Sequence, residues 1–410
     1  MTPSPTERTR RRRETRSSFH HENHRTLISV RPTDPRHEAE VDAIIVPTGR
    51  PAKAMRHAVE LAAELKCTLL ALCSRDSHAR QVADQAAGAD VDLVAIDVRG
   101  PLRNVLPRLR TSWLMENSRF ERRTDTSLKR NLGLLIAHLM DWRRIVFLDD
   151  DIIVPRAADL KVAAGLTDRH DVVGLNIGGY PDNSVVCHAY REAGGPQSTF
   201  LGGGALAVGA DALDSFFPNI YNEDWFFLLG ESGLRPTALT GHAVQQPYDP
   251  FAHWQRARYE ELGDLLAEGL FALLEDGKTP RHATYSFWRG FLVRRFRFIN
   301  DVMTMVRGAD LDPDRRGRML AALIAAGNLC QSIRADQCVR YLSAWRADRS
   351  VWRAHLEEMY LAHGPDTRGG GLDKLVASLG LTDRTWRSRG QRLDQDPADL
   401  DRALPVAVGQ

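Results

Sequence analysis

An apolar stretch that ends in three consecutive acidic residues constrains this chain more than any other feature. Residues 145–148 are Ile-Val-Phe-Leu, a composition typical of a buried strand, and Asp149, Asp150 and Asp151 follow directly. Adjacent carboxylates in a low-dielectric environment are unfavourable unless a cation neutralises them. Ligands of open α/β sheets collect at the carboxyl ends of strands. The pattern therefore predicts a divalent-metal and phosphate site at the end of this strand.

Strand and helix patterns alternate on both sides of this stretch. Such alternation predicts an α/β fold with a mostly parallel sheet and helices on its faces. Strands are expected at 41–47, 67–73, 91–96, 145–148 and 171–175, and helices at 52–65, 77–86, 124–140 and 156–165. Residues 176–200, which contain several glycines and prolines, are expected to form a loop.

The two ends of the chain differ from this central part. Residues 1–40 carry nine arginines and little apolar pattern, which predicts a disordered basic tail. An α/β domain is expected over 41–277. Over 278–410 strand signals fade, and we expect a helical C-terminal region that ends in a loose tail. Its helices are expected near 284–306, 314–332, 335–362 and 371–379.

Composition limits the classes of partner and the compartment. A formal charge of +2 over 410 residues gives no reason to expect a nucleic-acid partner. No apolar stretch reaches the roughly 18 residues that a membrane span needs, and no secretory signal opens the chain. The five cysteines show no C-x-x-C spacing, which favours reduced thiols and a cytoplasmic location.

A basic cluster early in the helix at 124–140 suggests an anion. Lys129, Arg130 and Asn131 lie near the start of this helix, where cations oppose the helix dipole. A diphosphate facing the cluster would explain it, and a solvated basic face is the alternative.

Two further motifs follow along the chain. Residues 200–208 contain Gly202, Gly203 and Gly204 before a short apolar strand, and glycines allow close approach of a backbone to another group. Asn222, Glu223 and Asp224 then open an aromatic helix. Acidic residues at a helix start also serve as caps, so a structural role is the alternative for them.

In their order, these motifs resemble a glycosyltransferase of the GT-A fold, of the family-2-like group. The resemblance covers residues 41 to 255. It implies that Asp149 to Asp151 correspond to the D-x-D motif, which holds Mg²⁺ or Mn²⁺ on a nucleotide-sugar diphosphate. Asp149 and Asp151 form the expected metal-binding pair, with Asp151 as the direct ligand. The resemblance also suggests His242 or His253 as a further metal ligand.

The same resemblance assigns roles to other positions. Asp224 is implied as the general base of an inverting reaction, with Glu223 beside it. Donor binding is implied for Pro47, Thr48, Arg50, Lys129, Arg130, Asn131, Asp149, Asp150, Gly203 and Gly204.

The expected function is metal-dependent transfer of a hexosyl group from a UDP- or GDP-sugar to an acceptor hydroxyl. Three alternatives stay open: a nucleotidyltransferase that makes a nucleotide sugar, a prenyl-diphosphate enzyme, and a non-catalytic nucleotide-sugar-binding protein. A homodimer through the helical C-terminal region is also considered.

Overall fold

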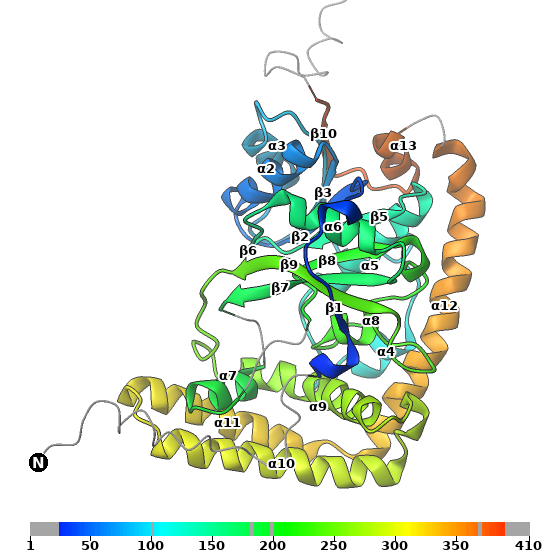
Figure 1. Cartoon of the computed structure of the whole chain (residues 1–410). Coiled ribbons are helices and arrows are strands. Elements are labelled where there is room, and N and C mark those ends of the chain that lie inside the picture. The colour runs from blue at the N-terminus through cyan, green and yellow to red at the C-terminus, as the bar shows by residue number, and fades with distance from the viewer. Residues whose placement is uncertain (1–23, 101, 181–183, 197–200, 368–370, 390–410) are drawn as a thin grey trace, which may run out of the picture.

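The computed structural model describes residues 24–100, 102–180, 184–196, 201–367 and 371–389 (Figure 1). A mixed sheet runs through its centre in the order β1-β9-β7-β8-β5-β2-β3-β4-β10, with β6 paired to β9. The strands are β1 (Ser29–Val30), β2 (Ala43–Thr48), β3 (Thr68–Cys73), β4 (Asp92–Asp97), β5 (Arg144–Leu148), β6 (Ile152–Ile153), β7 (Val172–Gly179), β8 (Ala205–Gly209), β9 (Thr237–Gln245) and β10 (Arg384–Arg387). The α/β class is confirmed.

Parallel pairing of β5, β2, β3 and β4 gives the sheet its centre. These strands are apolar on both faces because helices cover both sides. One core contains Ile45 and Phe147, and the other contains Ile44 and Val146, so successive side chains of β2 and β5 point to opposite faces. Of the nine strand pairings described, five are parallel and four are antiparallel. The sheet is therefore mixed to a greater degree than the alternation predicted.

An antiparallel strand lies between β5 and β7. The strand β8 pairs with both of them in the antiparallel sense. Its first residues consequently lie at the sheet edge where β5 ends, and the Asp149 N–H donates to the Gly204 carbonyl at 2.9 Å. This arrangement brings the glycine-rich stretch next to the acidic one.

The helices lie on both faces of the sheet. One face is covered by α2 (Arg56–Leu65), α3 (Ala79–Gln85) and α6 (Ala157–Leu166). The other is covered by α5 (Thr126–Leu139), with α4 (Arg110–Met115), α7 (Val185–Glu192) and α8 (Glu223–Phe227) at its periphery. Short 3-10 turns lie at Arg25–Leu27, Pro35–His37, Ala52–Met55, Ala210–Ala212 and Pro280–His282.

The C-terminal helices form a frame around this second face. In Figure 1, α9, α10 and α11 lie together at the bottom, and α12 runs up one side of the sheet. Their bounds are α9 (Arg256–Glu275), α10 (Tyr285–Gly308), α11 (Pro313–Ser332), α12 (Ala335–Thr367) and α13 (Gly371–Ser378). The buried Asp348 of α12 accepts hydrogen bonds from the Arg110 and Thr111 N–H groups at the start of α4 (2.7 and 2.8 Å). Among the described residues after 278, most lie in α10 to α13.

Three predictions about which segments lack regular structure are wrong in part. Residues 24–40 were expected to be disordered, yet β1 pairs with β9 and the buried His24 contacts Glu268 and Glu275. The expected loop at 176–200 contains the end of β7, extended to Gly179 by pairing with β9, and all of α7. The expected loose C-terminus contains β10, which pairs with β4. In each case long-range pairing overrides a weak local pattern.

Several predictions fall outside the described residues. These are the tail at 1–23, parts of the loop at 181–183 and 197–200, the segment at 368–370 and the C-terminal residues 390–410. The division into domains at residue 278 stays a prediction. No helix in the described parts of the chain is long and apolar enough to cross a membrane.

Candidate active site

The three consecutive aspartates lie at the sheet edge where β2 and β5 end and β8 begins. The Ile152 N–H donates to the Asp149 carbonyl at 3.1 Å, so the chain turns immediately after β5. Because of this turn, the three carboxylates meet three different sets of partners.

Asp150 and Asp151 lie against the loop that follows β2. The Thr48 hydroxyl donates to Asp150 at 2.7 Å, and Arg50 lies 3.2 Å from Asp150 and 2.7 Å from Asp151. The Gln245 side-chain amide also donates to Asp151 at 2.7 Å. The Arg50 side chain is 48% exposed, so this cation holds the two carboxylates from the solvent side.

Asp149 faces a different and more buried cation. Arg130 Nη2 lies 3.0 Å from both Asp149 oxygens, and Arg130 Nη1 lies 3.1 Å from Glu223 Oε1. Glu223 in turn pairs with Arg122 at 2.5 Å. The result is a chain of alternating charges, Arg122–Glu223–Arg130–Asp149, that joins α8, α5 and the end of β5.

Gly203 fits this network because of its missing side chain. A Cβ at this position would lie 2.6 Å from Arg130 Nη1, closer than real contacts allow. Gly203 thus leaves room for the Arg130 guanidinium.

Asp224 also contacts the glycine-rich stretch. Its carboxylate accepts from the Gly203 N–H at 2.7 Å and from the Trp225 N–H at 2.9 Å. Burial and the neighbouring Glu223 raise the pKa of Asp224, while Arg130 and the two N–H groups lower it. Burial also raises the pKa of Asp149 to about 7, against the opposing charge of Arg130. Both groups therefore take up protons more readily than ordinary aspartates.

A cavity of about 200 Å³ connects these groups. Asp149, Arg130, Glu223 and Asp224 line it together with Gly202 to Gly204. Its remaining lining is Arg122, Thr126, Ile177, Ser184, Cys187, Leu201, Tyr221, Asn222, Trp225, Gln245, Asp264 and Glu268.

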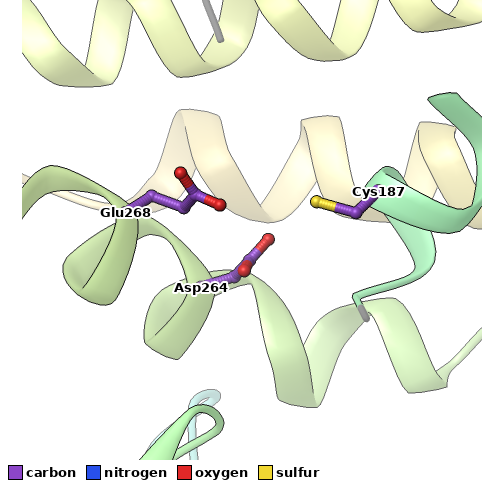
Figure 2. Close-up of side chains that lie close together, drawn as sticks. All are labelled: Cys187, Asp264 and Glu268. Atoms are coloured by element: carbon purple, nitrogen blue, oxygen red, sulfur yellow. The ribbon is translucent and has the colours of Figure 1, made fainter. Parts of the chain in front are cut away.

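The inner wall of this cavity carries a second acidic group (Figure 2). Asp264 and Glu268 lie on the same face of α9 and point toward Cys187 of α7, with ligand atoms within 4.8 Å of one another. Arg295 donates to Asp264 at 2.6 Å and Asn222 donates to its other oxygen at 3.0 Å. Burial raises the pKa of Cys187 well above its ordinary value, which favours the thiol. Arg295 also pairs with Glu261 at 2.9 Å, so this one cation serves two buried carboxylates, and Glu268 pairs with His24 at 3.2 Å.

Several predicted donor-binding residues have structural partners instead. Lys129 is buried, donates to the Thr48 carbonyl and to Ser74, and pairs with Asp125 at 3.2 Å. The Asn131 side chain bonds both the N–H and the carbonyl of Phe217 (2.8 and 2.9 Å). Lys129 therefore stabilises the end of β2, and Asn131 stabilises the loop that contains Phe217.

The two candidate histidine ligands lie away from the cavity lining. His242 and His253 are both exposed, and neither lines the cavity. The His242 backbone N–H donates to Asp159 at 3.0 Å. The residue of β9 that reaches the aspartates is Gln245. Pro47 lies within β2, next to Thr48, and does not line the cavity.

Sequence reasoning missed Arg122, Gln245, Cys187, Asp264 and Glu268. A usable signal existed for Asp264 and Glu268, which are spaced i, i+4 on a helix otherwise rich in leucine. Arg122 and Gln245 lie in segments without a distinctive pattern.

Comparison with known proteins gives distant similarity to solved structures. No protein-family model matches the chain, and no curated protein sequence does. A solved structure of a mannosyltransferase from Pyrobaculum calidifontis, in complex with GDP-mannose and Mn²⁺, is 17% identical. The match covers 81% of this chain and 89% of that chain, with a TM-score of 0.40. A similarity of this size does not establish a shared family.

Proposed function

We propose that this chain is a metal-dependent glycosyltransferase of the GT-A fold, acting on a nucleotide-diphosphate sugar and an acceptor hydroxyl. The observation that carries the proposal is the arrangement around one cavity. Asp149 at the end of β5 meets Arg130 there, and Asp224, a carboxylate of raised pKa that accepts from the Gly203 N–H, lines the same cavity. Combined metal, cation and base groups of this kind suit transfer with a diphosphate leaving group.

The residues present fit a divalent metal ion on the side of Asp150 and Asp151. Both carboxylates pair with Arg50, a 48% exposed cation that a metal ion can replace. Carboxylate oxygens are the ligands that Mg²⁺ and Mn²⁺ prefer. When bound, the ion would neutralise charge on the leaving diphosphate. Asp151 is the proposed direct ligand, while Asp149 is already held by the buried Arg130.

The chain's own cations support donor binding beside this position. Arg50, released from the two aspartates, is placed to contact the diphosphate. Thr48 and Pro47 at the end of β2 are proposed to seat the nucleotide, on a strand end that Lys129 fixes through the Thr48 carbonyl at 2.6 Å. Arg130 holds Asp149 and Glu223 in place at the floor of the cavity.

Asp224 is the proposed general base for the acceptor. Its oxygens keep lone pairs beyond the two backbone N–H bonds, and it lines the cavity. A raised pKa brings a carboxylate closer to the range in which a general base works best. An incoming hydroxyl opposite the leaving group would give inversion. A cytoplasmic site of action is also proposed, supported by five cysteines that are all free thiols.

A thermal-shift panel of nucleotide sugars, with and without Mn²⁺, tests the proposal. We expect one UDP- or GDP-sugar to raise the melting temperature only with the metal, because a ligand of the native state stabilises it. Release of nucleoside diphosphate on adding an acceptor then identifies transfer. Pyrophosphate release from a nucleoside triphosphate and a sugar phosphate would instead identify a nucleotidyltransferase. Donor binding without release under any acceptor would identify a binding protein.

A further inference from the structure

The outer face of α10 is basic and apolar at the same time. Between Tyr285 and Asn300 this helix contains four arginines and no acidic residue. Arg295 is buried, and the other three, Arg289, Arg294 and Arg297, are exposed. Tyr285 and Val293 are also exposed, at 53% and 51%. Tyr285, Arg289 and Val293 follow each other at a spacing of four, so they share one stripe of the helix.

A groove runs along this stripe. Two cavities of about 570 and 780 Å³ share Leu292, Val293, Arg297 and Ile333 in their lining, which makes them one depression between α10 and the corner where α11 meets α12. Leucine, valine, phenylalanine and isoleucine side chains contribute apolar surface, and Gly290 leaves open space where a Cβ would stand. The groove is thus apolar in the middle and bordered by arginines, with Asp301 and Asp336 also in its lining.

Two of these arginines carry charge that the described residues leave uncompensated. Within the described parts of the chain, neither Arg289 nor Arg294 forms an ion pair with a carboxylate, whereas Arg334 across the groove pairs with Asp336 at 2.7 Å. Arg294 lies over the Phe291 ring at 5.2 Å. Unpaired cations beside exposed apolar side chains favour a partner that offers both negative charge and an apolar environment.

We propose that the outer face of α10 docks on the surface of an anionic lipid bilayer. Basic helices with aromatic and aliphatic side chains on the same exposed surface lie at the boundary between headgroups and acyl chains. An acidic protein segment would pair with the arginines but would not explain why the apolar side chains of Tyr285 and Val293 are exposed beside them. A two-fold contact between copies would place Arg289 and Arg294 against like charges. The homodimer expected through the C-terminal region therefore requires another face.

The inner face of α10 connects this surface to the candidate active site. Arg295 points away from Val293, pairs with Glu261 at 2.9 Å and donates to Asp264, which lines the cavity. One helix, about 10–12 Å across, thus separates the proposed bilayer contact from a residue of the cavity wall. Docking would hold the cavity close to the membrane surface.

Vesicle co-sedimentation of the full chain tests the proposal. Vesicles of phosphatidylcholine alone are compared with vesicles of equal parts phosphatidylcholine and phosphatidylglycerol. The test variant combines Arg289→Gln with Arg294→Gln. The control combines Arg80→Gln with Arg103→Gln, which removes the same charge from exposed positions on another part of the chain. All proteins keep Arg10 to Arg13, so binding by the N-terminal arginines is common to them.

We expect the parent and the control to bind the anionic vesicles and the test variant to bind them about ten- to hundredfold less. Added salt should weaken binding of the parent, because screening shortens the range of the attraction. Val293→Ser should also reduce binding, whereas Ile324→Ser, which changes an apolar side chain of 50% exposure on α11, should leave it unchanged.

Three results would overturn the proposal. The first is equal vesicle binding by the test variant and the parent. The second is parent binding to polyglutamate but to neither kind of vesicle, which would identify an acidic protein partner. The third is a concentration-dependent dimer that the test variant abolishes, which would make this face a contact between copies. Circular dichroism and the melting temperature of each variant separate loss of binding from loss of fold.

Discussion

Arg130 Nη2 lies 3.0 Å from both carboxylate oxygens of Asp149, and the Arg130 side chain is only 4% exposed. The same guanidinium also pairs with Glu223, so one buried cation bridges two acidic groups from different parts of the chain. Because of this contact, Asp149 has a different environment from Asp150 and Asp151. Asp149 belongs to the cavity floor, whereas Asp150 and Asp151 face an exposed cation.

Removal of the Arg130 charge should destabilise the fold. Arg130→Met leaves the Glu223 and Asp149 carboxylates without their shared partner, and breaking a buried pair typically costs about 3–5 kcal/mol. Urea unfolding of the variant should show a reduced midpoint with an unchanged slope. Arg50→Met removes an exposed cation from the adjacent Asp150 and Asp151 and serves as the matched control, with an expected effect of about 1 kcal/mol or less. Equal losses in the two variants would contradict the central position given to Arg130.

Arg50→Ala should increase the affinity for Mn²⁺ in the absence of donor. Arg50 occupies the carboxylates of Asp150 and Asp151, so a metal ion must compete with it. Since exposed ion pairs contribute about 0.2–1 kcal/mol each, we expect roughly two- to tenfold tighter binding by isothermal titration. Arg36→Ala, at an exposed pair with Asp34 elsewhere, should bind as the parent does.

The aspartates themselves give the complementary test. Asp151→Asn should abolish the Mn²⁺-dependent thermal shift with a nucleotide sugar, while Asp149→Asn should retain part of it because Arg130 already neutralises Asp149. The reverse order of effects would move the metal ion to Asp149 and would contradict the assignment proposed above.

Asp224→Asn should separate donor binding from transfer. The amide keeps the shape of the carboxylate but cannot accept a proton, so a loss of about 10²–10⁴ in the transfer rate is expected. The Mn²⁺-dependent thermal shift with the donor should persist. Since the pKa of Asp224 is raised, the activity of the parent should fall on acidification at a higher pH than an ordinary aspartate would give. Asp276→Asn, an exposed change at the end of α9, is the control, and full transfer by Asp224→Asn would place the base elsewhere.

The sequence predicted the part of the fold that local pattern determines. β2, β3, β4, β5 and α5 lie where apolar runs and helical periodicity placed them. Asp149 contacts Gly204 because β8 runs antiparallel to β5. No local sequence pattern indicates the direction of a strand relative to its neighbour. Direction is set by tertiary packing.

The candidate site was predictable to the same degree. Acidic residues after a buried strand indicated the correct edge of the sheet. The role of the basic cluster on α5 was ambiguous. The sequence does not distinguish a buried lysine that faces a bound anion from one that donates to a backbone carbonyl. Lys129 meets the Thr48 carbonyl, and Asn131 meets the Phe217 backbone. Of the three, only Arg130 lines the cavity.

The contact of His24 with Glu268 and Glu275 should make the stability of the fold depend on pH. Burial opposes the charged form, yet the two carboxylates raise the pKa of His24 from 6.5 to about 9. A raised histidine pKa stabilises the folded state fully below pH 6.5, and this contribution is lost as the pH rises toward about 9.

His24→Gln should remove this dependence. The difference in unfolding free energy between parent and variant should therefore be largest near pH 6 and should shrink between pH 6.5 and about 9. Chemical denaturation at several pH values measures it. His78→Gln changes an exposed histidine at the start of α3 and should give a difference that stays near zero. A difference for His24→Gln that grows with pH would mean that the histidine is neutral in the folded protein. Residues 24–40 would then be held to the sheet by the β1–β9 pairing and apolar contacts rather than by charge.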